Sequence, residues 1–223
     1  MRVTVNGIGI YYEIAGEGPP VILLHGNGED CRIFDRLVEE LKRTNTVFSI
    51  DTRGHGKSDN VNSFHYSDMV EDVVAFIREL EIKKPILYGF SDGGIVGMML
   101  ASKYPDALSG LIASGPNLTP KDMKLYYRLP TQLVYYFKRD PKVELMIREP
   151  NITDEVLSKI SVPVLITIAE KDIIPYSHAE HIASSVQNGT VMLVPYEDHA
   201  SYIVNSDRLF PLISEFIATN SQS

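Results

Sequence analysis

A serine stands between two glycines in the motif G-F-S-D-G, residues 89–93. The apolar run before it, residues 85–90, predicts a strand, and residues 92–103 predict a helix after it. A turn this sharp holds its serine in a strained conformation, and the glycines let neighbouring backbone approach. The Ser91 hydroxyl would project beside a helix N-terminus, which favours the negative charge that develops in acyl transfer. We therefore expect Ser91 to be a nucleophile.

A serine hydroxyl is a weak nucleophile unless a base removes its proton, so the six histidines of the chain are candidates for that base. His199 follows the last expected strand, residues 190–195, and its loop can reach the sheet edge where Ser91 points. His178 and His181 lie three residues apart on an expected helix without a third ligand, which favours a surface helix over a metal site. The best candidate base is His199.

The third member must be a carboxylate beyond the end of another strand. Asp172 lies in the turn that follows the apolar run 162–169, with Glu170 as a weaker alternative. Its carboxylate would accept a hydrogen bond from one imidazole nitrogen of His199, which fixes the tautomer and stabilises the imidazolium. Asp198 adjoins His199 and is expected to point away from it. The chain order is therefore serine, aspartate, histidine.

These residues need a sheet whose strands end at one edge. Alternating segments at residues 2–6 and 8–14 predict a hairpin. Strand and helix patterns then alternate, with strands at 21–24, 46–50, 85–90, 107–114, 162–169 and 190–195, and helices at 30–43, 67–80, 92–103, 176–186 and 203–218. This order predicts an α/β fold, a mostly parallel central sheet with helices on both faces. Ser67 is expected to cap the second helix, and residues 219–223 are expected to be frayed.

Residues 117–160 contain no strand pattern and interrupt this alternation. They hold two helix-like pieces, 121–138 and 153–160, with three expected breakers at Pro130, Pro141 and Pro150. We expect one domain over residues 1–223, with this segment as a small insertion between two strands.

The sequence as a whole resembles the α/β-hydrolase family along nearly its full length, because that family uses the same triad order. It also carries H-G-N-G at residues 25–28, and in the family this turn supplies one oxyanion-hole amide. By that match the donors would be the backbone N–H groups of Asn27 and Asp92. A second turn, D-T-R-G-H-G-K-S-D at residues 51–59, resembles the D-x-R-G-x-G-x-S turn of the family. We interpret its Arg53 and first aspartate as structural.

The resemblance implies a serine hydrolase that acts on a small carboxylic ester, or a related acyl substrate, through an acyl-enzyme and without a cofactor or metal. Other triad-dependent activities stay open: enol-lactonase, C–C hydrolase, thioesterase and aminopeptidase. A non-catalytic small-molecule-binding homologue is a further alternative. In the family, the insertion after the sixth strand forms a cap over the site.

Two features could select the substrate. The cap is rich in tyrosine, and Tyr126 and Tyr127 either pack it onto the sheet or form an aromatic wall for an apolar group. Asp92 either interacts with the dipole of its helix or faces the pocket and favours a cationic substrate. The run S-D-G-G resembles the elbow of valacyclovir-hydrolase-like amino-acid esterases.

The overall composition limits the partners. Net charge is −8, from 21 Lys and Arg against 29 Asp and Glu, which argues against a nucleic-acid partner. The single cysteine, Cys31, allows no intramolecular disulfide. No apolar stretch approaches the roughly 20 residues of a membrane span, and the first residues do not resemble a signal peptide. We expect a cytoplasmic protein that binds a small-molecule substrate, with neither nucleic acid nor membrane as a partner.

Overall fold

A β-hairpin opens the chain in the computed structural model, which describes residues 1–221. Strands β1 (Arg2–Val5) and β2 (Ile8–Ala15) pair in antiparallel fashion. Asn6 and Gly7 join them with positive φ angles of 48° and 77°. Two successive positive φ angles are typical of the tight hairpin turn whose twist matches that of its strands. The predicted hairpin is therefore present.

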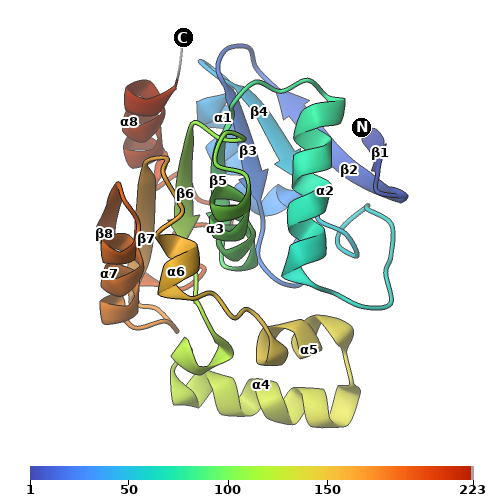
Figure 1. The fold of residues 1–223 in the computed structure, drawn as a ribbon, viewed down its shortest axis with the longest axis vertical. Helices are drawn as coiled ribbons and strands as arrows, with labels where there is room; N and C mark the ends of the chain where they lie inside the picture. Colours follow the sequence, from blue (N-terminus) through green and yellow to red (C-terminus); the bar gives the residue numbers. More distant parts are fainter. Residues whose placement is uncertain (222–223) are drawn as a thin grey trace.

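An eight-stranded sheet in the order β1-β2-β4-β3-β5-β6-β7-β8 forms the centre of the molecule (Figure 1). β2 pairs with β4 in antiparallel fashion, and the pairs from β4 to β8 are parallel. The parallel strands are β3 (Pro20–Leu24), β4 (Thr46–Ile50), β5 (Ile86–Phe90), β6 (Gly110–Ser114), β7 (Val164–Lys171) and β8 (Gly189–Asp198). The predicted fold class, a mostly parallel sheet in an α/β fold, is confirmed.

Helices cover both faces of the sheet, and β3 shows why. Val21 and Leu23 belong to a hydrophobic cluster with residues of α1 (Asp35–Leu41) and α8 (Phe210–Asn220). Ile22 and Leu24 belong to a second cluster with residues of α2 (Tyr66–Glu79) and α3 (Asp92–Lys103). All four side chains are fully buried, because alternate residues of a strand point to opposite faces and both faces are covered. In Figure 1, α2 and α3 cross in front of the sheet.

The segment between β6 and β7 holds a short 3₁₀ helix (Pro120–Asp122), α4 (Leu125–Lys138), α5 (Pro141–Arg148) and α6 (Asp154–Leu157). Figure 1 shows α4 and α5 side by side at one end of the molecule, beyond the sheet. α6 is different, since it contacts α3 and α7 (Tyr176–Ser185) and its Leu157 is fully buried. We propose that α4 and α5 act as the cap within a single domain.

The cap departs from the sequence expectation at Pro130. The break expected there is wrong, because α4 continues through it. Proline removes one backbone donor from the helix, and the Thr131 hydroxyl next to it donates to the Tyr127 carbonyl at 2.9 Å. α5 was not expected. It begins at Pro141, and the Asp140 side chain caps it by accepting from the Lys142 N–H.

Helix ends also differ from expectation in the body of the fold. Ser67 does not cap α2; the helix begins at Tyr66, and the Glu149 carboxylate from the end of α5 accepts the Tyr66 N–H at 3.1 Å. The last helix, expected from residue 203, begins at Phe210 with Pro211 in its first turn. α8 continues through Asn220, and the last two residues of the tail expected to be frayed lie outside the described residues.

Candidate functional site

Ser91 occupies the turn between β5 and α3 with φ 50° and ψ −110°. A non-glycine residue with this positive φ is strained, and such strain concentrates at functional sites. A Cβ at Gly89 would collide with the backbone of Gly93, and one at Gly93 would collide with the carbonyl oxygen of Leu24. The two glycines are therefore required by close backbone contacts, which hold the serine at the carboxyl end of β5.

The structure brings Ser91, His199 and Asp172 together from three loops. His199 Nε2 lies 3.2 Å from Ser91 Oγ, and His199 Nδ1 lies 2.7 Å from Asp172 Oδ1. Asp172 follows β7 and His199 follows β8, so both reach the same sheet edge as Ser91. In this arrangement Nδ1–H donates to the carboxylate, which leaves Nε2 as an acceptor for the serine hydroxyl.

Asp172 is fully buried and held from several sides. Its Oδ1 accepts the Ile174 N–H at 3.0 Å, and its Oδ2 accepts the Ala169 N–H at 3.3 Å. Lys124, just before α4, donates through Nζ to the Asp172 carbonyl at 2.6 Å. The carboxylate is therefore fixed in place for His199, and the loop that carries it is tied to the cap.

Gly115 and Phe90 define the position of the His199 ring. The rings of Phe90 and His199 lie 5.0 Å apart between centroids. Gly115, directly after β6, has φ 61°, and a Cβ at this position would lie 2.7 Å from His199 Cε1. Sequence reasoning missed Gly115; the G-P pair it forms with Pro116 after a strand marked only a turn.

The two expected oxyanion donors, Asn27 and Asp92, line the cavity together with Ser91. Asp92 is the first residue of α3, a position whose N–H has no acceptor within a helix. Asn27 is half-buried in the turn after β3 and lines the same cavity as Ser91 and Asp92. The neighbouring Gly26 N–H donates to Glu29 Oε2 at 2.9 Å. The turn is thus braced by Glu29, which sequence reasoning did not identify.

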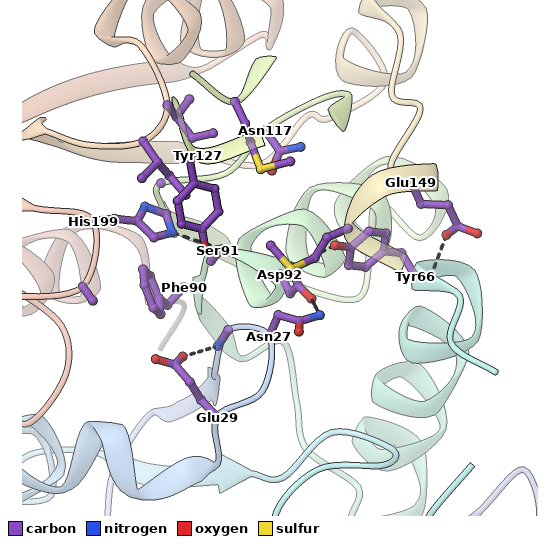
Figure 2. Close-up of a pocket in the computed structure, with 17 residues that line it drawn as sticks. Asn27, Glu29, Tyr66, Phe90, Ser91, Asp92, Asn117, Tyr127, Glu149 and His199 are labelled. Carbon is purple, nitrogen blue, oxygen red and sulfur yellow. Dashed lines mark hydrogen bonds between the residues drawn. The ribbon is translucent and has the colours of Figure 1, made fainter. Parts of the chain in front are cut away.

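The Asp92 side chain is buried between two donors, as Figure 2 shows. Asn27 Nδ2 donates to its Oδ2 at 2.9 Å, and the Tyr66 hydroxyl donates to its Oδ1 at 2.8 Å. Burial raises the pKa of the Asp92 carboxyl, and the two hydrogen bonds oppose this effect. Burial also raises the pKa of Tyr66, which keeps its hydroxyl protonated as a donor.

A cavity of about 200 Å³ lies over Ser91, between the sheet edge and the cap. Three carboxylate residues line it, Glu29, Asp92 and Glu149, and none of its described lining residues is a lysine or an arginine. Burial raises the pKa of Glu29 as well. The rest of the wall is largely apolar, with Met123, Tyr127, Met146, Ile173 and Ile174. The cavity therefore combines an apolar wall with negative charge.

The two tyrosines singled out in the sequence have different surroundings. Tyr127 lines the cavity over Ser91. Tyr126 does not; it borders a separate groove between α4 and α5, and 64% of its surface is exposed. Tyr127 borders this groove too, so of the two tyrosines only Tyr127 reaches both the groove and the cavity over Ser91.

The D-T-R-G-H-G turn does not line the cavity over Ser91. Arg53 binds Asp72 of α2 through Nε and Nη2, at 2.6 and 2.8 Å, and Asp51 accepts the backbone N–H groups of Cys31 and Lys57. Asp30, Cys31 and Asp51 bring ligand atoms close enough for a metal ion. Burial raises the pKa of the Cys31 thiol far above its ordinary range, however, and Asp51 is already used as an acceptor. A structural role fits these residues better than a metal site.

The fold and this constellation define an α/β-hydrolase. The model of the family described as "Serine aminopeptidase, S33" matches residues 19–158, more than half of the chain, so the chain belongs to this family. It is a serine hydrolase of the α/β-hydrolase fold. The matched residues include Ser91 and end before Asp172 and His199.

A relative agrees with this family, and two solved structures share the fold. The chain is 29% identical to "Serine hydrolase BPHL" from Homo sapiens, over 97% of this chain and 85% of that protein. Its fold matches a thermophilic esterase from Thermogutta terrifontis, with TM-score 0.80, 22% identity and full coverage of both chains. It also matches the enol-lactonase from Burkholderia xenovorans LB400, with TM-score 0.80, 19% identity and coverage of 98% of this chain and 100% of that chain.

Among residues 1–221, no helix is both long and apolar enough to cross a membrane.

Proposed function

We propose that the protein hydrolyses small carboxylic esters through an acyl-enzyme formed on Ser91. The observation that carries this proposal is a chain of two hydrogen bonds. One joins Ser91 Oγ and His199 Nε2 at 3.2 Å, and the other joins His199 Nδ1 and Asp172 Oδ1 at 2.7 Å. In this chain the imidazole of His199 serves as the base, and the buried carboxylate of Asp172 orients the imidazole and stabilises its charged form. The strained turn that presents Ser91 supports the same role.

The reaction follows from these positions. Ser91 Oγ attacks the ester carbonyl carbon while its proton passes to His199 Nε2. The carbonyl oxygen becomes an oxyanion, which accepts from the Asn27 and Asp92 N–H groups. His199 then gives the proton to the departing alkoxide, which leaves as an alcohol. Water attacks the acyl-enzyme with the same base, and the carboxylic acid departs as Ser91 regains its proton.

The charge on the cavity wall favours a substrate that carries a protonated amine. Glu29, Asp92 and Glu149 line the cavity without a lysine or an arginine among its described lining residues, and of the three only Glu149 has an ion-pair partner, His65 at 2.7 Å. Each oxygen of Asp92 accepts one hydrogen bond, and a carboxylate oxygen can accept two. Asp92 therefore keeps acceptor capacity toward an ammonium group close to the reacting carbon. The cavity of about 200 Å³ limits such substrates to small esters.

An ester panel with the Ser91→Ala variant tests the proposed reaction. We expect turnover of short-chain p-nitrophenyl esters by the wild type, with an early burst if deacylation is slow, and loss of turnover in Ser91→Ala. The same assay with a thioester, an enol-lactone, a substrate with a hydrolysable C–C bond and an aminoacyl anilide distinguishes ester hydrolysis from the other triad-dependent reactions. Turnover confined to one of these four substrates would overturn the ester assignment. Turnover of neither the p-nitrophenyl esters nor any of these four substrates would favour a binding protein.

The role of Asp92 has its own test. We expect Asp92→Asn to lower the ratio of kcat/KM for an amino-acid ester over that for its uncharged analogue by at least about tenfold, because a hydrogen bond to a charged group contributes about 1.5–3 kcal/mol. Asp106→Asn, an exposed position on the surface, makes the same change in net charge outside the cavity and serves as the control. An unchanged ratio in Asp92→Asn would contradict the amine preference.

A further inference from the structure

The outer face of α4 is apolar and exposed. Six large side chains lie on it at helical spacing, each more than half exposed, from 53% at Leu129 to 73% at Phe137: Leu125, Tyr126, Leu129, Leu133, Tyr136 and Phe137. Positions 125, 129, 133 and 137 are four residues apart, so they follow one side of the helix. We call these six residues the outer face.

The opposite side of α4 is apolar as well, and there it is partly covered. Tyr127 and Val134 border a groove of about 250 Å³ against Val143 and Met146 of α5, and Tyr126 lies at the boundary between this groove and the outer face. A large apolar side of a helix is normally packed against another element, and one left exposed marks an interaction surface. No residue of α4 is buried, so within the described part of the chain the outer face lacks the cover that its composition requires.

Positive charge lies at both ends of the helix that carries this face, in a chain of net charge −8. Residues 121–142 contain only two aspartates against six cationic residues, which are Lys121, Lys124, Arg128, Lys138, Arg139 and Lys142. None of these six forms an ion pair with a described residue, whereas eleven of the other fifteen lysines and arginines do. Lys124 is already used by the Asp172 carbonyl, whereas Lys121, Lys138 and Arg139 are exposed at the two ends of α4 and are available to an external anionic partner.

We propose that the outer face of α4 docks on the surface of an anionic phospholipid bilayer. The apolar side chains would enter the boundary between headgroups and acyl chains, and the flanking cations would contact the phosphates. Tyrosine suits this boundary because its ring is apolar and its hydroxyl is polar. A second copy of the chain fits less well, since two cationic caps repel each other.

The proposed docking differs from the sequence expectation that a membrane is not a partner. That expectation rested on the lack of an apolar run long enough to span a bilayer, and peripheral docking needs no such run. Docking would also place the cavity over Ser91 next to the lipid, because Tyr127 on the inner side of α4 lines both that cavity and the groove against α5.

A tryptophan reporter tests the docking directly, because the chain contains no tryptophan. Phe137→Trp would place the single indole at the most exposed position of the outer face. We expect its emission to shift to the blue on addition of phosphatidylcholine vesicles that contain phosphatidylglycerol. Met192→Trp on β8 is the control and should not shift. An unshifted spectrum for Phe137→Trp would overturn the proposal.

Co-sedimentation with the same vesicles separates the two contributions. We expect Lys121→Gln with Lys138→Gln to lower the partition coefficient by about tenfold or more, because each cation near the surface contributes to binding. Arg36→Gln with Lys83→Gln, two exposed cations outside the cap without an ion pair to described residues, should leave it unchanged. Equal binding of the wild type to pure phosphatidylcholine vesicles would contradict the requirement for anionic lipid.

The apolar contribution is tested by Leu133→Ser with Phe137→Ser, for which we expect at least about tenfold weaker partitioning. Met192→Ser with Leu193→Ser, at side chains exposed by 43% and 42%, is the matched control. Thermal melting should be unchanged in Leu133→Ser with Phe137→Ser, since these positions are exposed. Wild-type protein that ignores the vesicles but forms a dimer, lost in Phe137→Ser by analytical ultracentrifugation, would assign the face to a second copy and overturn the proposal.

Discussion

A Cβ atom at Gly115 would lie 2.7 Å from Cε1 and 2.9 Å from Nδ1 of His199. Gly115 follows β6, and its N–H donates to the Thr167 carbonyl of β7 at 2.9 Å, so its backbone is fixed by the sheet. The imidazole therefore rests against a backbone that has no room for a side chain. This contact explains how a ring on the loop after β8 is held at hydrogen-bond distance from Ser91.

We expect Gly115→Ala to lower kcat for a p-nitrophenyl ester by about a hundredfold, because a displacement of the base by about 1 Å costs that much. Gly7→Ala is the matched control. Gly7 also has a positive φ, 77°, but its Cβ would meet no atom within 4 Å. Both variants should lose about 1 kcal/mol of stability from backbone strain. A Gly115→Ala enzyme with the wild-type kcat would show that His199 does not depend on this contact.

Tyr66→Phe removes the hydroxyl that donates to Asp92 Oδ1 at 2.8 Å. This donor favours the charged carboxylate, so its loss should raise the pKa of Asp92 further above its ordinary value. The acid limb of kcat/KM for an amino-acid ester should therefore move to higher pH, while the profile for an uncharged ester stays in place. Parallel pH–rate profiles of the two esters measure this. A common shift of both profiles would point to an effect on His199 instead.

Arg53 forms a two-pronged ion pair with the buried carboxylate of Asp72. Arg53→Met would leave that charge without its partner, and we expect a loss of about 3–5 kcal/mol in the free energy of unfolding by urea. Arg53→Lys keeps the charge but not the planar fork, so it should restore only part of the stability. An Arg53→Met protein as stable as the wild type would show that Asp72 is compensated elsewhere.

Stability should fall in mild acid because of two buried histidines. Burial lowers the pKa of His55 from 6.5 to about 4, and burial lowers the pKa of His25 as well. In that range the unfolded chain binds protons that the native chain does not, so stability decreases as pH falls. For His55 the loss is about 2 kcal/mol between about pH 7 and about pH 5. The raised pKa values of Asp92 and Glu29 act in the opposite direction and offset part of this loss.

Urea unfolding at about pH 7 and about pH 5 measures this loss of stability for the wild type and for His55→Gln. The variant should show a shallower decline, because the group that gains a proton on unfolding is gone. His181→Gln is the control, since that side chain is half exposed. An equally steep decline in His55→Gln would assign the acid sensitivity to other groups.

The sequence predicted the positions of Ser91, Asp172 and His199 at the sheet edge because each residue follows an expected strand with a clear apolar run. Parallel strands end at one edge, so residues that follow them meet even when they are distant in the chain. The same reasoning could place Asn27 and Asp92 beside Ser91, since both also follow strands. Local pattern and strand order were sufficient to predict that these residues meet at one edge of the sheet.

Other parts of the site depend on contacts that no local pattern encodes. Glu149 reaches the N-terminus of α2 from the end of a helix that was not expected, and Tyr66 reaches Asp92 from within α2. Gly115 is required by a ring that lies on a different loop. These pairings are set by the path of the cap and by packing between layers, which only the three-dimensional structure reveals.

The central claim is that His199, oriented by Asp172, activates Ser91. Labelling with a fluorophosphonate, followed by intact mass and peptide mapping, tests it most directly. We predict a single adduct, located on Ser91, that is absent in Ser91→Ala and forms at least about a hundredfold more slowly in His199→Ala, as expected when the base is removed. An unlabelled wild-type protein, an adduct on another residue, or equal labelling rates in wild type and His199→Ala would contradict the claim.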